Sequence, residues 1–137
     1  MMVQNTNVLS ILLLNFSVIL VQVSSNSFVK VRGNDCMTVT DGGACIESVA
    51  DSNNRYYNNF DCDMKVLGAG RLILHRFDTE NYYDRLYINP TSNAVFYQNY
   101  SPYYDQGNGP SNVQVNQNDI IRFTTDGSVI RTGFTKG

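Results

Sequence analysis

The chain has 137 residues, 16% of them charged, and a formal net charge of −2. This length suits one domain with some chain to spare. The absence of any long basic run excludes the electrostatic footprint of a nucleic-acid-binding protein. The sequence holds nine Tyr, seven Phe and no Trp, together with frequent Asn, Thr, Ser and Gly, and this composition favours an all-β chain.

The N-terminal part contains an uncharged apolar run over residues 8–23. The run is shorter than the roughly 20 apolar residues of a comfortable membrane span, and Asn15 interrupts it. Val23 and Ser25 supply small residues at the two positions that define a cleavage site. We therefore expect a signal peptide over residues 1–25, with an uncleaved signal anchor as the alternative because no Lys or Arg precedes the run. The mature chain would begin at Asn26, carry no membrane span and be secreted into an oxidising, extracellular environment.

The mature chain consists of short apolar-polar alternations separated by turn signals such as Asp41-Gly42-Gly43. Many short strands at such spacing are typical of a β-sandwich or jelly roll. An N-terminal segment, residues 26–35, would precede the main domain and contain a weak strand. The predicted strands are residues 28–32, 37–40, 44–49, 63–67, 72–77, 84–88, 94–98, 112–115, 119–124 and 128–134.

Residues 72–88 combine two of these strands with a connection that holds Asp78, Glu80 and Asp84. Three acids in one short segment repel one another unless a cation, a cationic partner or water screens them. This concentration of acid in a lightly charged chain is the best functional clue in the sequence. Strict alternation predicts which side chains share a face: Leu72, Leu74 and Arg76 against Ile73, His75 and Phe77, then Leu86 and Ile88 against Arg85 and Tyr87.

Catalysis and zinc binding find little support. The only histidine is His75, and no Cys-x-x-Cys, Gly-x-Ser-x-Gly or His-Glu-x-x-His motif occurs. Glu80 and Asp84 could be taken for a glycosidase pair, but no long aromatic cleft is suggested, so we expect no enzyme. The sequon at Asn99 is a candidate glycosylation site, although Pro102 follows it.

Four segments occur in the order seen in CUB domains: YYNNFDCDMKV (56–66), LILHRFDTE (72–80), YDRLYI (83–88) and FTTDGSVIRTGF (123–134). The chain from residue 36 to residue 137 resembles this family of extracellular jelly-roll β-sandwich modules. GACIES (43–48) and the Gly109-Pro110 loop look like a divergent branch of the family. The resemblance implies a CUB-like, jelly-roll domain over residues 36–137.

The cysteines depart from the family pattern. The usual second pair is absent, the connection from Glu80 to Asp84 is short, and the count of three is odd. Relatives in the divergent branch often continue to a final cysteine, so a further alternative is that the chain is a fragment of a larger extracellular protein. With the resemblance in view, we pair Cys45 with Cys62; the alternative is Cys36 with Cys62.

Many CUB domains bind one Ca²⁺ at one end of the sandwich. The resemblance assigns their acids to Glu80, Asp84 and Asp126 and makes Tyr56 a supporting hydrogen-bond donor. Asp126 precedes Gly127, in a turn that would present the Ser128 carbonyl as a further ligand. Oxygen-rich loops are what a hard cation prefers. The alternative is that the acids bind no metal and form a solvated cluster in which Asp126 stabilises its own turn.

The resemblance implies a secreted, non-catalytic module that binds a protein through calcium and the acidic loops, which would meet a basic side chain of the partner. The alternative is a carbohydrate-binding or matrix module that stacks sugar rings on exposed tyrosines: Tyr97, Tyr100, Tyr103 and Tyr104.

Overall fold

The computed structural model describes residues 1–3, 10–14, 17–21, 26–73, 76–89, 95–97 and 111–135. This described part is all-β: it contains no α-helix and a single 3₁₀ turn, η1 (Asp41–Gly43). Its strands are β1 (Met2–Val3), β2 (Ser10–Leu14), β3 (Ser17–Val21), β4 (Phe28–Gly33), β5 (Met37–Thr40), β6 (Cys45–Ser48), β7 (Asp61–Val66), β8 (Gly70–Ile73), β9 (Arg76–Asp78), β10 (Arg85–Ile88), β11 (Val95–Tyr97), β12 (Ser111–Val115), β13 (Ile120–Thr124) and β14 (Gly133–Thr135).

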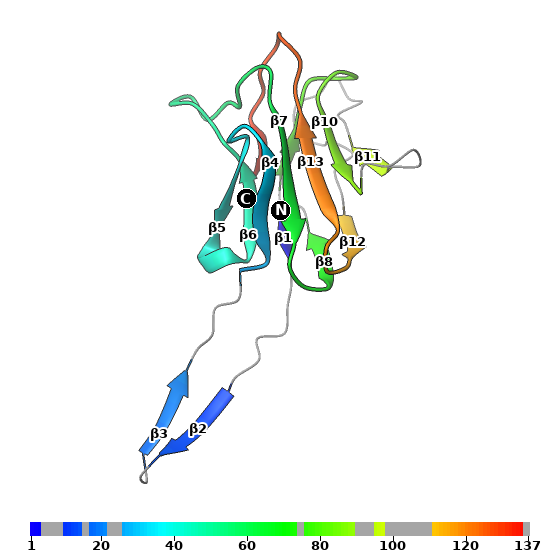
Figure 1. The fold of residues 1–137 in the computed structure, drawn as a ribbon. Coiled ribbons are helices and arrows are strands. Elements are labelled where there is room, and N and C mark those ends of the chain that lie inside the picture. The colour runs from blue at the N-terminus through cyan, green and yellow to red at the C-terminus, as the bar shows by residue number, and fades with distance from the viewer. Residues whose placement is uncertain are drawn as a thin grey trace.

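Two antiparallel five-stranded sheets make up the body of the fold (Figure 1). The first has the order β12-β8-β1-β6-β5 and the second has the order β11-β10-β13-β7-β4. β14 pairs with β9, and β2 pairs with β3 in a hairpin drawn apart from the two sheets. Neighbouring strands are often far apart in sequence, so loops from distant parts of the chain meet at the same end.

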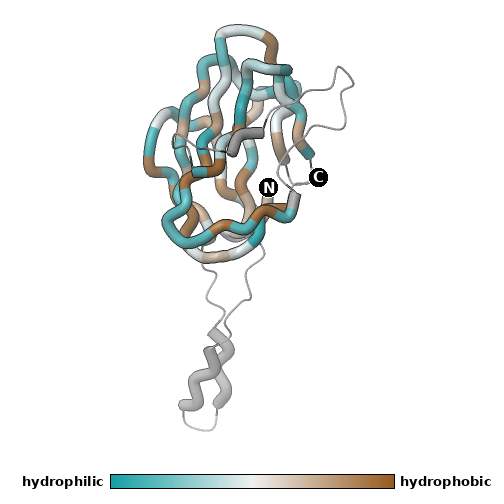
Figure 2. The backbone as a smooth tube through the Cα atoms, turned by 90° about the vertical axis from the view of Figure 1, so that its right-hand side faces the viewer, coloured by the Kyte–Doolittle hydropathy of each residue, from teal (hydrophilic) through white to brown (hydrophobic). Residues whose placement is uncertain are grey.

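Alternation along the strands explains why the sheets pack face to face. In β10, Leu86 and Ile88 are buried while Arg85 and Tyr87 are partly exposed, as predicted from the sequence. β13 alternates in the same way, and Figure 2 shows the switching of hydrophilic and hydrophobic residues along the chain. Both sheets contribute side chains to one buried cluster, which makes the fold β-sandwich-like. The largest fully buried side chains are Tyr56, Phe28, Phe123, Phe134, Met1, Ile46, Met64, Leu72, Leu86, Ile121, Val66 and Val115.

Most predicted strands are confirmed to within two residues, and residues 37–40 match exactly. The predicted strand over residues 128–134 is wrong for most of its length, because only β14, which starts at Gly133, is extended. Val129 has a φ of 45°, a left-handed conformation that no regular strand accepts. Thus a β-branched run that looks like a strand is mostly an irregular approach to β14.

The predicted faces of residues 72–77 are also wrong. Leu72 and Phe77 are both buried, at 0% and 4% exposure, although strict alternation would place them on opposite faces. The structure divides this stretch into β8 and β9, and Leu74 and His75 lie outside the described residues. β8 and β9 belong to different sheets, and each directs an apolar side chain into the core.

The disulfide joins Cys36 to Cys62, with Cα atoms 5.8 Å apart, so the predicted pairing of Cys45 with Cys62 is wrong. β4 pairs with β7 so that Gly33 lies opposite Cys62, and Cys36 follows shortly after in the chain. Cys45 belongs to β6 in the other sheet, where it is buried and its thiol donates to Asp41 Oδ2 at 3.4 Å. Register therefore decides the partner of Cys62.

The N-terminal residues enter the fold in a way that the sequence did not indicate. Met2–Val3 forms β1 in the middle of the first sheet, between β6 and β8. The apolar run contributes the β2–β3 hairpin, and the residues next to the predicted cleavage site, 22–25, lie outside the described part. Within the described residues, no helix has the length and apolar character required to cross a membrane.

Candidate metal site

The connection between β9 and β10 carries two of the three acids. Glu80 follows β9, a turn over residues 81–83 reverses the chain, and Asp84 comes directly before β10. Asp84 is completely buried. β10 pairs with β13 so that Arg85 lies opposite Thr124, which brings Asp126 beside Asp84. The antiparallel register thus unites residues that are distant in the sequence.

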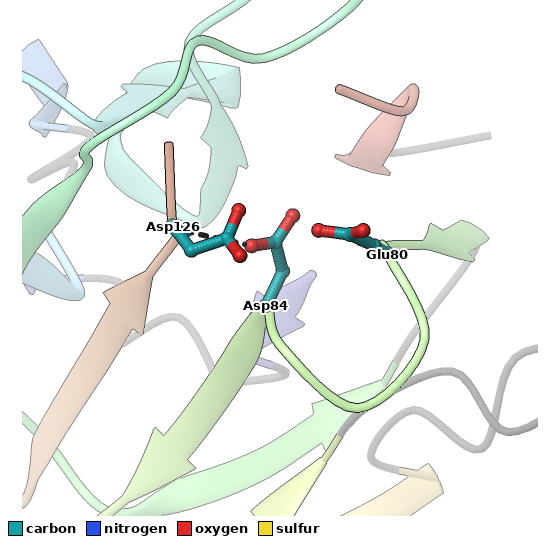
Figure 3. A group of neighbouring side chains, drawn as sticks. All are labelled: Glu80, Asp84 and Asp126. Carbon is teal, nitrogen blue, oxygen red and sulfur yellow. Dashed lines mark hydrogen bonds between the residues drawn. The ribbon is translucent and has the colours of Figure 1, made fainter. Parts of the chain in front are cut away.

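The three carboxylates converge in the structure. Glu80, Asp84 and Asp126 each offer one oxygen, and these oxygens lie within 4.8 Å of one another. Figure 3 shows the Asp84 carboxylate between those of Asp126 and Glu80. The backbone N–H of Asp126 donates to Asp84 Oδ1 at 3.0 Å, and this bond fixes the relative position of the two loops.

Tyr56 supports this arrangement from the core side. Its hydroxyl donates to Asp84 Oδ2 and accepts a hydrogen bond from the backbone N–H of Glu80 at 3.0 Å. The ring is fully buried and lies edge-on to Phe123, with centroids 5.5 Å apart. One phenol therefore holds both ends of the acidic loop in place.

The electrostatics are those of a crowded acidic site. Burial raises the pKa of Glu80, and the negative charges of Asp126 and Asp84 raise it further. Burial also raises the pKa of Asp84, against the opposing effect of the hydrogen bonds from Tyr56 and the Asp126 N–H. Burial raises the pKa of Tyr56 as well, so the phenol remains a donor. Glu80 Oε2 is buried and has no hydrogen-bond partner among the described residues.

Asp126 also stabilises its own turn. Its Oδ1 accepts hydrogen bonds from the Ser128 N–H at 2.9 Å and from the Ser128 hydroxyl at 3.4 Å. Ser128 itself is exposed. The Asp126 carboxylate therefore stabilises its own turn and also belongs to the group of three acids.

Asp78 has a different role from its neighbours. It is buried, and its Oδ2 accepts hydrogen bonds from the Thr132 hydroxyl at 2.7 Å and the Thr132 N–H at 3.2 Å. This carboxylate anchors the segment before β14 and lies outside the group of three acids.

The geometry of the three acids fits a hard cation. Ca²⁺–oxygen bonds are about 2.3–2.6 Å, so two oxygens on one ion lie at most about 5 Å apart. The 4.8 Å limit on the oxygens of Glu80, Asp84 and Asp126 meets this requirement. Because three carboxylates supply fewer than the roughly 6–8 oxygens that Ca²⁺ takes, carbonyls, water or a bound partner would complete the coordination.

Several predicted functional residues fall outside the described part of the chain. The sequon Asn99 and the tyrosines Tyr100, Tyr103 and Tyr104 are among them, and Tyr97 is described only as part of β11. The alternative sugar-stacking surface therefore lies, apart from Tyr97, outside the described residues.

A ladder of charged side chains crosses the second sheet and was not predicted from the sequence. Asp63 Oδ2 accepts from Arg32 Nε at 2.8 Å, and Asp63 Oδ1 accepts from Arg122 Nε at 2.7 Å. Burial of Asp63 opposes its ionisation, but the hydrogen bonds from Arg122 and Arg32 outweigh it and hold its pKa at about 2. The only sequence signal for this ladder was that the three predicted strands carry opposite charges. That signal could be used only once the pairing and register of the strands were known.

No family model matches the sequence, and comparisons with curated proteins and with solved structures likewise find no match. The class that the fold and site define is therefore an all-β, disulfide-linked, sandwich-like domain with an acidic cluster at one end.

Proposed function

We propose that the chain is a secreted, non-catalytic module of CUB-like, jelly-roll type that binds a protein partner through Ca²⁺ held by Glu80, Asp84 and Asp126. The observation that carries the proposal is the convergence of three carboxylate oxygens within 4.8 Å of one another, together with a buried Glu80 Oε2 that has no hydrogen-bond partner among the described residues. A cation there would relieve the repulsion among the acids and supply the missing partner.

The surroundings suggest the chemistry of the partner. Tyr82 and Tyr83 lie on the same loop as Glu80 and Asp84 and are exposed at 56% and 62%. Acidic oxygens beside exposed aromatic rings favour a cationic group, which carboxylates attract and ring faces can contact. A Lys or Arg side chain of an extracellular protein is the partner that this surface fits best.

Calcium should stabilise the fold, because it binds the native site and has no comparable site in the unfolded chain. At a hundredfold excess over Kd the gain is about 2.7 kcal/mol. Thermal melting with excess Ca²⁺ should therefore occur several degrees above melting with a chelator. Tyrosine-sensitised Tb³⁺ luminescence would report binding directly.

Matched variants make the test specific. Asp84→Asn and Asp126→Asn should each remove most of the rise in melting temperature that calcium causes. In the presence of chelator, each variant should melt at a higher temperature than the wild type where relief of the repulsion outweighs the lost hydrogen bonds. Asp35→Asn is the control, because Asp35 is 89% exposed, pairs with Lys30 and lies outside the cluster. A wild-type melting temperature that does not respond to calcium, together with no Tb³⁺ signal, would refute the proposal.

A further inference from the structure

The shortest strand of the first sheet occupies one of its most enclosed positions. β1 lies between β6 and β8, so that Met2 is opposite both Cys45 and Ile73. Ile46 N–H donates to Met1 C=O at 2.8 Å, and the Val3 N–H donates to Ala44 C=O at 3.0 Å. This position, which we call the β1 slot, is thus a complete antiparallel strand site occupied by three residues.

The slot selects its occupant by side-chain pattern. Met1 and Val3 are buried in the common core, at 0% and 2% exposure, while Met2 is partly exposed. An occupant therefore needs apolar side chains at alternate positions. The chain terminus is a poor match at one point: the Met1 ammonium donates to Ile46 C=O at 2.9 Å, and its burial lowers its pKa. An ordinary peptide N–H would make this bond without burying a charge.

β14 lies beside β6 as β1 does, but at the other end of that strand. It runs antiparallel to β9, and β1 runs antiparallel to β8, which precedes β9 in the chain. Phe134 N–H donates to the Ser48 hydroxyl at 3.2 Å, so β14 lies beside one end of β6 while β1 lies beside the other.

Removal of residues 1–25, which is part of the proposed function, would empty this slot. Backbone groups of Ala44 and Ile46 would lose their partners inside a sheet, and such groups are costly when left without hydrogen bonds. The apolar core between β6 and β8 would open at the same time. An emptied slot is thus a strong acceptor for an extended peptide.

We propose that Met1–Val3 is a placeholder, and that in the secreted protein the β1 slot binds an extended segment of a partner polypeptide, antiparallel to β6 and β8, with apolar side chains at alternate positions. Main-chain hydrogen bonds would supply the affinity and the two core-facing side chains the selectivity, as in other complexes formed by strand addition.

The test uses the secreted product of the full-length chain, whose start at Asn26 is first established by N-terminal sequencing. Cys45 lies opposite Met2, and the other two cysteines form the disulfide, so the alkylation rate of Cys45 reports whether the slot is covered. The probe is an acetylated peptide with the sequence of residues 1–6. At ten times its Kd it should slow alkylation by N-ethylmaleimide about tenfold, and it should shift the amide NMR signals of Ala44 and Ile46.

Two control peptides sharpen the result. The Val3→Asp peptide should protect Cys45 far less, because a carboxylate would enter the core. The non-acetylated peptide should bind more weakly at neutral pH, where its N-terminal amine is charged, than at a pH above the pKa of that amine. The proposal is overturned if the secreted product keeps Met1, if Cys45 is unreactive without peptide, or if the Val3→Asp peptide protects equally. None of these outcomes depends on calcium, so this proposal and the calcium site can fail separately.

Discussion

Replacing Tyr56 by Phe should destabilise the domain through the loss of a single hydroxyl. The ring would keep its buried position against Phe123, so packing is conserved. Two hydrogen bonds would disappear, one to the Asp84 carboxylate and one from the Glu80 N–H. A hydrogen bond to a charged group contributes about 1.5–3 kcal/mol and a neutral one about 1 kcal/mol, so the expected loss is about 2–4 kcal/mol.

The measurement is thermal and urea denaturation at neutral pH in the presence of a chelator. For a domain of this size the loss corresponds to a fall in melting temperature of roughly 10 °C. Tyr57→Phe is the matched control. The Tyr57 side chain is 48% exposed, so loss of its hydroxyl should change the stability little. Calcium should still stabilise Tyr56→Phe, since the phenol positions the acids and is not assigned as a ligand. Equal behaviour of the two variants would refute the assigned role of Tyr56.

Further predictions concern pH and the disulfide. Because the pKa values of Glu80 and Asp84 are raised in the fold, the metal-free protein holds protons that the unfolded chain has released; its stability should fall as pH rises above about 4, and calcium should remove that fall. Asp63 acts in the opposite direction: its stabilisation is present above about pH 4 and is lost toward pH 2, so Asp63→Asn should cost about 2 kcal/mol at pH 7 and little at pH 2, as acid titration of both proteins would show. Non-reducing peptide mapping should find Cys36 joined to Cys62, and reduction should destabilise the fold by about 3–4 kcal/mol for this loop length; a different linkage would contradict the register of β4 and β7.

Local pattern was sufficient for most strands and insufficient for their partners. Residues 37–40 followed from the turn signal after them, and the shared face of Leu86 and Ile88 followed from alternation. Burial of both Leu72 and Phe77 could not, because β8 and β9 join different sheets and alternation within one strand does not relate them. The disulfide depended on the register of β4 against β7, which brings Cys36 to Cys62, and such a register is a property of the whole topology.

The candidate site divides in the same way. Glu80 and Asp84 share a loop, so their proximity is visible in the sequence. Asp126 joins them only through the pairing of β10 with β13, and the resemblance to a family, rather than any local signal, pointed to it. The placement of Met2–Val3 inside a sheet had no local signal at all, because two residues carry no periodicity.

The position of β13 has a consequence for synthesis of the protein in the cell. β13 pairs with both β7 and β10. The strand pairing of the second sheet therefore cannot be completed until residues 120–124 have left the ribosome. Until then β7 and β10, which carry buried apolar residues, present open edges to other chains. Pairing between such distant segments is slow. The nascent domain should therefore depend on chaperones until translation has passed β13, and its yield on expression should be sensitive to the supply of them.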